Sequence, residues 1–155
     1  MTIELDVQYA SDFVPCPDAS MIEQWVSAAL ANQQENGELS IKIVDEAEMA
    51  MLNFDFRKKQ KPTNVLSFPC QLPEPMRGDM LGDIAICAPV VNQEAIAQGK
   101  PLFAHFAHMV IHGVLHLLGF DHENDEDATK MEALEVTILK TLGFADPYGV
   151  HIVHD

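Results

Sequence analysis

The amino-acid sequence predicts an α+β fold, in which a small four-stranded mixed β-sheet packs with about five helices. Apolar and polar residues alternate over residues 3–7 and 39–43, a period that is typical of half-buried strands. Over residues 22–30 and 128–142, apolar residues instead recur every three or four positions, as on one face of a helix. The segments follow the order βαβαββααα, and strands joined through a helix usually pair in parallel by a right-handed crossover.

Proline and glycine delimit the expected elements. We expect strands at residues 3–7, 39–43, 65–68 and 83–87. We expect helices over residues 22–30, from residue 45 onward, and over residues 89–97, 101–118 and 128–142. Pro62 stops any continuation of the second helix, because it has no N–H to donate and its ring clashes with the preceding turn. Gly99 and Gly143 end the third and fifth helices, and a loop over residues 69–78 joins the last two strands.

The first two helices also carry signals at their starts. Ser20 and Glu23 have the spacing of a capping box for the first helix, which Gly37 ends. Asp45, with Glu48 three residues later, can start the second helix. The inner face of that second helix is expected to carry Met49, Leu52 and Phe56.

Length and composition indicate one cytoplasmic domain spanning residues 1–155. Apolar residues make up 48% of the chain, enough to build a packed core. The N-terminus lacks the pattern of a signal peptide, and no apolar segment approaches the roughly 20 residues that cross a bilayer, so we expect no membrane association. Three cysteines, with no Cys-x-x-Cys pair, favour reduced thiols over a disulfide framework.

The formal net charge of −15 argues against non-specific nucleic-acid binding, because an acidic body repels phosphates at long range. The cations are nevertheless unevenly placed. Four of the nine lie within five residues, at Arg57, Lys58, Lys59 and Lys61. This basic segment, residues 57–61, is a candidate contact for phosphate, although a solvated loop is an equally good interpretation of each lysine taken singly.

Three histidines interrupt the most apolar part of the chain. His112 and His116 are four residues apart, so they project from one face of a helix, and Gly119 suits the positive φ of a helix end. The chain can then fold back and present His122 from the following turn. Three protein ligands leave a fourth position for water, as in catalytic rather than structural zinc sites, and we expect one zinc ion per chain. Asp121 is a candidate acceptor for the free ring N–H of a ligand.

The other histidines are weaker candidates. His105 and His108 lie within about 80° of the ligand pair on an ideal helix, but we expect them to face solvent. His151 and His154 lie in a polar tail and are expected to be uninvolved. Gly113 stands where the His-Glu-x-x-His peptidases have their general base, which disfavours a peptidase of that class.

Four blocks of sequence carry a resemblance to a known family. They are the run from His112 to His122, "RKKQKPTNVLSF" at residues 57–68, "LGDIAI" at residues 81–86, and the acidic helix around residues 131–135. In these blocks the chain resembles the YbeY family of bacterial endoribonucleases, with similarity over roughly residues 41–148.

The resemblance implies that His112, His116 and His122 are the metal ligands and that Arg57 is functionally important. It implies a zinc-dependent, single-strand-specific endoribonuclease acting in 16S rRNA 3′-end maturation and ribosome quality control. We hypothesise that Arg57 neutralises the scissile phosphate. Candidates for the general acid are His105, His108 and Asp83. Because the chain is so acidic, we expect it to dock on basic ribosomal proteins or assembly factors of the small subunit, for which residues 123–127 offer one contact.

Two alternatives remain open at this point. The chain could be a non-catalytic ribosome-assembly factor with a structural zinc, which requires a fourth ligand such as Cys70, Cys87 or Asp121. It could also be a metallohydrolase of a peptide or small ester. Imidazole ligands suit Zn, Ni, Cu and Fe alike, so the ligand set favours zinc without identifying it.

Overall fold

The computed structural model describes residues 2–31, 33–34 and 36–148, and within these it confirms the α+β class and the predicted order of elements. The strands are β1 (Thr2–Ala10), β2 (Asn36–Val44), β3 (Val65–Pro69) and β4 (Met80–Cys87). The helices are α1 (Ala19–Leu30), α2 (Glu46–Arg57), α3 (Ala88–Gln98), α4 (Leu102–Leu117) and α5 (Asp125–Thr141). His151 and His154 lie outside the described residues.

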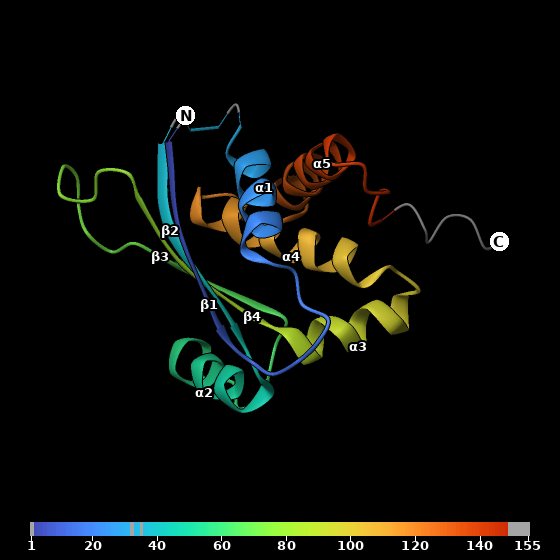
Figure 1. Cartoon of the computed structure of the whole chain (residues 1–155). Coiled ribbons are helices and arrows are strands. Elements are labelled where there is room, and N and C mark those ends of the chain that lie inside the picture. Colours follow the sequence, from blue (N-terminus) through green and yellow to red (C-terminus); the bar gives the residue numbers. More distant parts are fainter. Residues whose placement is uncertain (1, 32, 35, 149–155) are drawn as a thin grey trace.

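The sheet is mixed, with the strand order β1-β2-β4-β3. β1 pairs in parallel with β2, and β2 in parallel with β4, while β3 runs antiparallel to β4 at the edge. The register shifts between Glu38 and Leu39, where β2 meets β4. β3 and β4 follow each other in sequence, and the loop that connects them projects beyond the sheet (Figure 1).

Helix α4 lies at the centre of the larger hydrophobic core. Its residues are apolar on almost every side, as expected for a helix that is surrounded by other elements. Phe106, Val110, Ile111, Val114 and Leu115 are fully buried, and they pack with side chains of α1, α3, α5 and one face of the sheet. The predicted apolar run of residues 101–118 is therefore the element around which the molecule is assembled.

Helix α2 covers part of the opposite face of the sheet, away from α1, α4 and α5 (Figure 1). It packs through a second, smaller cluster that includes Met49, Leu66 and Cys87. The expected inner face of this helix was wrong at one position, since Phe56 is 49% exposed. Asn53 is buried in its place, and its amide donates to the Lys61 carbonyl at 2.8 Å, which holds the chain that follows the helix.

Two expected boundaries also differ. Asp18, rather than the pair Ser20 and Glu23, caps α1, and its carboxylate accepts from the Met21 N–H at 2.8 Å. Gly37 does not end α1 but lies within β2, where an added Cβ would come within 3.1 Å of Leu30 and Leu81. Among the described residues, no helix has the length and apolar character required to cross a membrane.

Gly113 determines how closely α4 approaches the sheet. A Cβ there would lie 3.1 Å from two side-chain carbons of Ile84 and 3.3 Å from the Ser67 hydroxyl. That hydroxyl donates to the Gly113 carbonyl at 3.1 Å, so β3 and the middle of α4 are in direct contact.

We predict that Gly113→Val lowers the free energy of unfolding by about 1–3 kcal/mol, because the added branches would force α4 away from the sheet. Urea denaturation measures the effect. Ala97→Val, at an exposed position of α3, should change stability by no more than about 0.5 kcal/mol. A Gly113→Val variant as stable as the parent would contradict the close packing.

Candidate metal centre and catalytic cavity

The end of α4 positions the third histidine. After Leu117 the chain closes a Schellman turn, in which Gly119 N–H donates to the His116 carbonyl and Phe120 N–H to the Leu115 carbonyl, both at 3.0 Å. Gly119 has the positive φ, 103°, that the sequence predicted for this turn. The turn reverses the chain and directs His122 back toward the helix.

The three histidines converge as predicted. One nitrogen from each of His112, His116 and His122 lies within 4.8 Å of the others. The Nε2 atoms of His112 and His116 are 3.1 Å apart, and the ring centroids of the three pairs are 4.6–5.5 Å apart. Within the described part of the chain, this group contains no cysteine. The donor set therefore fits a divalent ion held by three imidazoles.

The protonation of the rings agrees with such a use. Burial lowers the pKa of His116, and repulsion from the neighbouring His112 and His122 lowers it further. A neutral ring is the form that can coordinate a metal ion, because only then is a nitrogen lone pair available.

Glu135 of α5 orients the first of these rings. Its carboxylate is fully buried and accepts from Nδ1 of His112 at 2.6 Å, which leaves Nε2 of that ring directed toward the other two histidines. The same carboxylate accepts from Nε2 of His108 at 2.9 Å and from the Tyr148 hydroxyl. Burial alone would raise the pKa of Glu135, but the hydrogen bonds and charges of His108 and His112 outweigh it and hold that pKa at about 2.

His105 and His108 are buried, so the expectation that they face solvent was wrong. His108 contacts Glu135, and burial lowers its pKa in spite of that contact. His105 binds Glu94 of α3 through Nε2 at 2.9 Å. Glu94 also accepts from the Asn64 amide at 3.0 Å. These two histidines thus join α4 to α3 and α5 rather than pointing into open solvent.

Glu135 was not predicted from the sequence, which suggested Asp121 as the acceptor instead. The Asp121 carboxylate accepts from the backbone N–H of His122 at 2.6 Å, and so shapes the turn. The signal for Glu135 was available, because it occupies a helical position between Met131 and Ile138 on the buried stripe of α5. A carboxylate on such a stripe requires a buried donor, and the histidines of α4 provide it.

A cavity of about 740 Å³ opens over the three histidines. Its wall is formed by the end of α2, the segment before β3, β3 itself and the turn after α4. Besides the histidines, its lining includes Phe56, Arg57, Asn64, Ser67, Asp121 and Glu123. Arg57, which is distant from the histidines in sequence, therefore shares one cavity with all three of them.

The chain turns sharply after Arg57. Lys58 adopts a left-handed conformation, with φ 60°, and the Asn53 amide holds the Lys61 carbonyl. Lys58, Lys59 and Lys61 are exposed but do not line the cavity, so only the arginine of the basic segment is directed into it. Among the described residues, no carboxylate forms an ion pair with Arg57, which leaves its guanidinium free for an anionic group.

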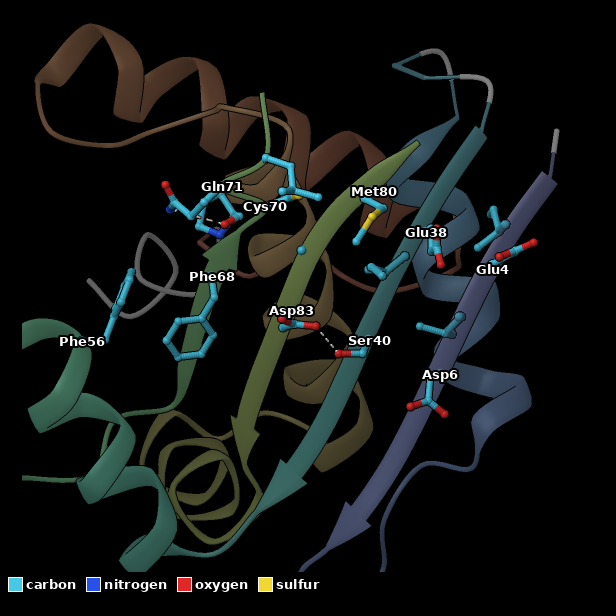
Figure 2. A pocket seen from close by; sticks show the side chains of 16 residues that line it. Glu4, Asp6, Glu38, Ser40, Phe56, Phe68, Cys70, Gln71, Met80 and Asp83 are labelled. Carbon is cyan, nitrogen blue, oxygen red and sulfur yellow. Dashed lines mark hydrogen bonds between the residues drawn. The ribbon is translucent and has the colours of Figure 1, made fainter. Parts of the chain in front are cut away.

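Asp83 and the cysteines lie elsewhere. Asp83 accepts from the Ser40 hydroxyl at 2.5 Å on the face of the sheet opposite α4, since the next residue, Ile84, faces Gly113. Figure 2 shows this face, with Asp83 and Ser40 side by side and Cys70 near its upper edge. Cys87 is buried against α2. Asp83, Cys70 and Cys87 are therefore not placed to act on a group held by the histidines.

We predict that Glu135→Gln weakens binding of a divalent metal ion by about 10- to 100-fold. The neutral amide replaces the negatively charged carboxylate that accepts from Nδ1 of His112, so the tautomer of that ring is no longer fixed. Competition with a chromophoric chelator measures the affinity. Glu132→Gln, an exposed position on the same helix, is the matched control and should leave it unchanged. Unaltered affinity in a folded Glu135→Gln protein would show that the carboxylate has no part in positioning the ligand.

Comparisons with known proteins support the fold and give the family. A solved structure of TM1509 from Thermotoga maritima superimposes with a TM-score of 0.60 and 24% sequence identity, and the match covers 89% of this chain and 87% of that one. This likeness supports the fold. A sequence model of the Endoribonuclease YbeY family matches residues 11–143, which include Arg57 and all three converging histidines. By that match the chain belongs to the YbeY family of endoribonucleases.

Proposed function

We propose that this chain, acting as a single domain over residues 1–155, is a metal-dependent endoribonuclease that cleaves single-stranded RNA in 16S rRNA 3′-end maturation and ribosome quality control. The observation that carries the proposal is the shared cavity, which presents one guanidinium and three convergent imidazoles to the same space. Cleavage of a phosphodiester needs both a group that stabilises the phosphate charge and a group that activates the attacking oxygen.

His112, His116 and His122 would hold the ion, for which we favour zinc, with one ion per chain. Zinc in a three-imidazole site supplies Lewis acidity, and thereby activates water or polarises a phosphoryl oxygen. Arg57 would grip the non-bridging phosphate oxygens through its planar fork. The guanidinium keeps the scissile phosphate beside the histidines and stabilises the charge that develops on it.

The observed contacts favour this function over the two alternatives. A structural zinc would need a fourth protein ligand, and among the described residues the convergent group has only the three histidines. A peptidase would need a general base near the metal, and the residue after His112 is a glycine packed against Ile84 and Ser67. His105 and His108 are engaged in buried contacts with Glu94 and Glu135, which disfavours both as the general acid.

Elemental analysis combined with cleavage of a defined single-stranded RNA tests the assignment. We expect His116→Ala to lose both the bound metal and the cleavage. We expect Arg57→Ala to keep the metal while its cleavage rate falls by about 10²- to 10³-fold, the usual loss when one preorganised donor to a developing charge is removed. Arg77→Ala, an exposed arginine paired with Glu74 outside the cavity, is the matched control and should cleave normally.

Unchanged turnover in Arg57→Ala would remove Arg57 from the mechanism. Cleavage that persists in a metal-free protein would contradict metal dependence. A spectroscopic signal from a metal-bound thiolate that disappears when the metal is removed would favour the structural alternative. A panel of peptide and ester substrates addresses the remaining alternative, and hydrolysis of one of these in preference to RNA would support it.

We further infer that the chain docks on a basic protein or assembly factor of the small ribosomal subunit. The open face of the sheet supports this, because a cavity of about 960 Å³ there is lined by Glu4, Asp6, Glu38 and Asp83 and by no lysine or arginine. Figure 2 shows these carboxylates spread across β1, β2 and β4. Residues 123–127, which the sequence suggested, also carry four carboxylates, but on the sheet face the four line a single hollow, which suits a cationic segment.

Glu38→Lys should reduce retention of purified small ribosomal subunits on the immobilised protein by about tenfold at low salt, because juxtaposed like charges cost more than 1 kcal/mol. Binding is measured at low and high ionic strength. Glu126→Lys on α5 reverses a charge within residues 123–127 and serves as the comparison. Weakening by Glu126→Lys alone would move the contact to that helix, and the absence of any effect would contradict electrostatic docking.

A further inference from the structure

Phe56 is an aromatic side chain that packs against a neighbouring ring and remains about half exposed. It is 49% exposed, although it belongs to the last turn of a helix whose other face is packed. Its ring meets the Phe68 ring edge to face, with centroids 4.6 Å apart and an interplanar angle of 69°. The contact with Phe68 packs one side of the ring, and the exposed part of the ring remains available to a ligand.

The position of this ring is unusual because it lines two hollows at once. It contributes to the cavity over the histidines and to the cavity on the open face of the sheet, and among the described residues only Pro69 shares that property. Figure 2 shows Phe56 and Phe68 together at one end of the sheet-face cavity, away from Glu4 and Asp6. Phe56 therefore stands at the rim between the two hollows.

The two sides of this rim differ in whether they offer a cation. On the side of the histidines the lining includes Arg57 together with the carboxylates of Asp121 and Glu123, and the exposed lysines of the basic segment follow Arg57 in the chain. On the other side, among the described residues, the lining carries four carboxylates and no lysine or arginine. A phosphate therefore has a cationic partner on the first side and none on the second, so the backbone of a bound strand is expected to stay beside Arg57 while a base reaches the rim.

We propose that the exposed face of Phe56 is a stacking platform for one unpaired RNA base, the base next to the phosphate that Arg57 grips. This inference rests on the proposed function and adds a binding subsite to it. Stacking on an aromatic ring is open to every base, because each has a π-face, and it requires that face to be free. A base within a duplex is already stacked on both sides, so the platform gives a physical reason for a preference for single strands.

A neighbouring phenylalanine provides a stringent comparison. Phe54 lies on the same helix, two residues earlier, and is similarly exposed at 41%. It lines a separate hollow on the outer side of α2, which contains no histidine, and its ring lies under the Lys58 ammonium. If exposure of an aromatic ring on α2 were sufficient, both residues would contribute to RNA binding, whereas the platform requires Phe56 alone.

Single-turnover cleavage of a short single-stranded RNA by the metal-loaded protein tests the proposal, with the enzyme concentration varied to obtain both half-saturation and the maximal rate. Phe56→Leu keeps an apolar side chain against Phe68 but removes the flat face. We expect it to raise the half-saturating concentration by about 5- to 150-fold, the range measured for loss of one base-aromatic stack. Phe56→Tyr should restore binding, and Phe54→Leu should behave as the parent protein.

A second arm locates the base. Abasic nucleotides are placed one at a time on either side of the cleaved bond. At one position the parent protein should lose about the same factor as Phe56→Leu, and Phe56→Leu should lose nothing further there, because the two partners of one contact are being removed.

The outcomes separate this proposal from the function on which it rests. If the parent protein cleaves the RNA and Phe56→Leu has the same half-saturation, the platform is wrong and the endoribonuclease assignment stands. Additive losses from Phe56→Leu and from every abasic position would also overturn the platform. If the metal-loaded parent protein neither binds nor cleaves single-stranded RNA, the proposed function itself fails.

Discussion

One ionised carboxylate, enclosed between α4 and α5, is the interaction on which the candidate site depends. Glu135 receives hydrogen bonds from His108 and His112 of α4 and from Tyr148, which follows α5. A charge buried without partners costs several kcal/mol, so the carboxylate is tolerated only when its donors are in place. The donors are in turn oriented by it. Packing of α5 against α4 and orientation of the His112 ring therefore depend on each other.

The architecture explains why the site forms at this particular edge. Helix α4 is buried almost throughout, and His116 lies in its last turn, where the helix leaves the core. The Schellman turn then brings His122 back across the exposed end. Arg57 arrives from the opposite face of the sheet, at the end of α2, and reaches the same cavity around the edge strand β3. The three histidines and the arginine are thus supported by different helices and meet only at the rim of the sheet.

Local periodicity and spacing were enough to predict much of this structure. The order of elements, the glycine at the end of α4 and the convergence of His112, His116 and His122 all follow from patterns within a few residues. The resemblance to a known family was confirmed, and the arginine that it singled out shares the cavity of the histidines. Short-range patterns work here because the helix and turn that hold the ligands are continuous in sequence.

Partners across elements could not be predicted in the same way. The bond between His108 and Glu135 joins residues 27 positions apart, and although the apolar stripe of α5 indicates that Glu135 is buried, nothing within either helix indicates which side chain faces it. Phe56 was expected to be buried because it fits a helical apolar pattern, but the smaller α2 cluster ends before it and Asn53 is buried instead. In both cases the outcome depends on which surfaces meet in three dimensions, and periodicity does not carry that information.

The candidate site is anchored in two separate hydrophobic clusters, and this determines how it would be lost on partial unfolding. The histidines are anchored in the larger core, whereas Arg57 and Phe56 depend on the few side chains that attach α2 to the far side of the sheet. Proteins open first where the least apolar surface is buried. Mild heat or denaturant should therefore detach α2 before the rest of the fold unfolds, giving an intermediate in which the three histidines still converge but Arg57 and Phe56 have left the cavity. The integrity of the histidine cluster would then overestimate how much of a heated or aged sample keeps the whole candidate site.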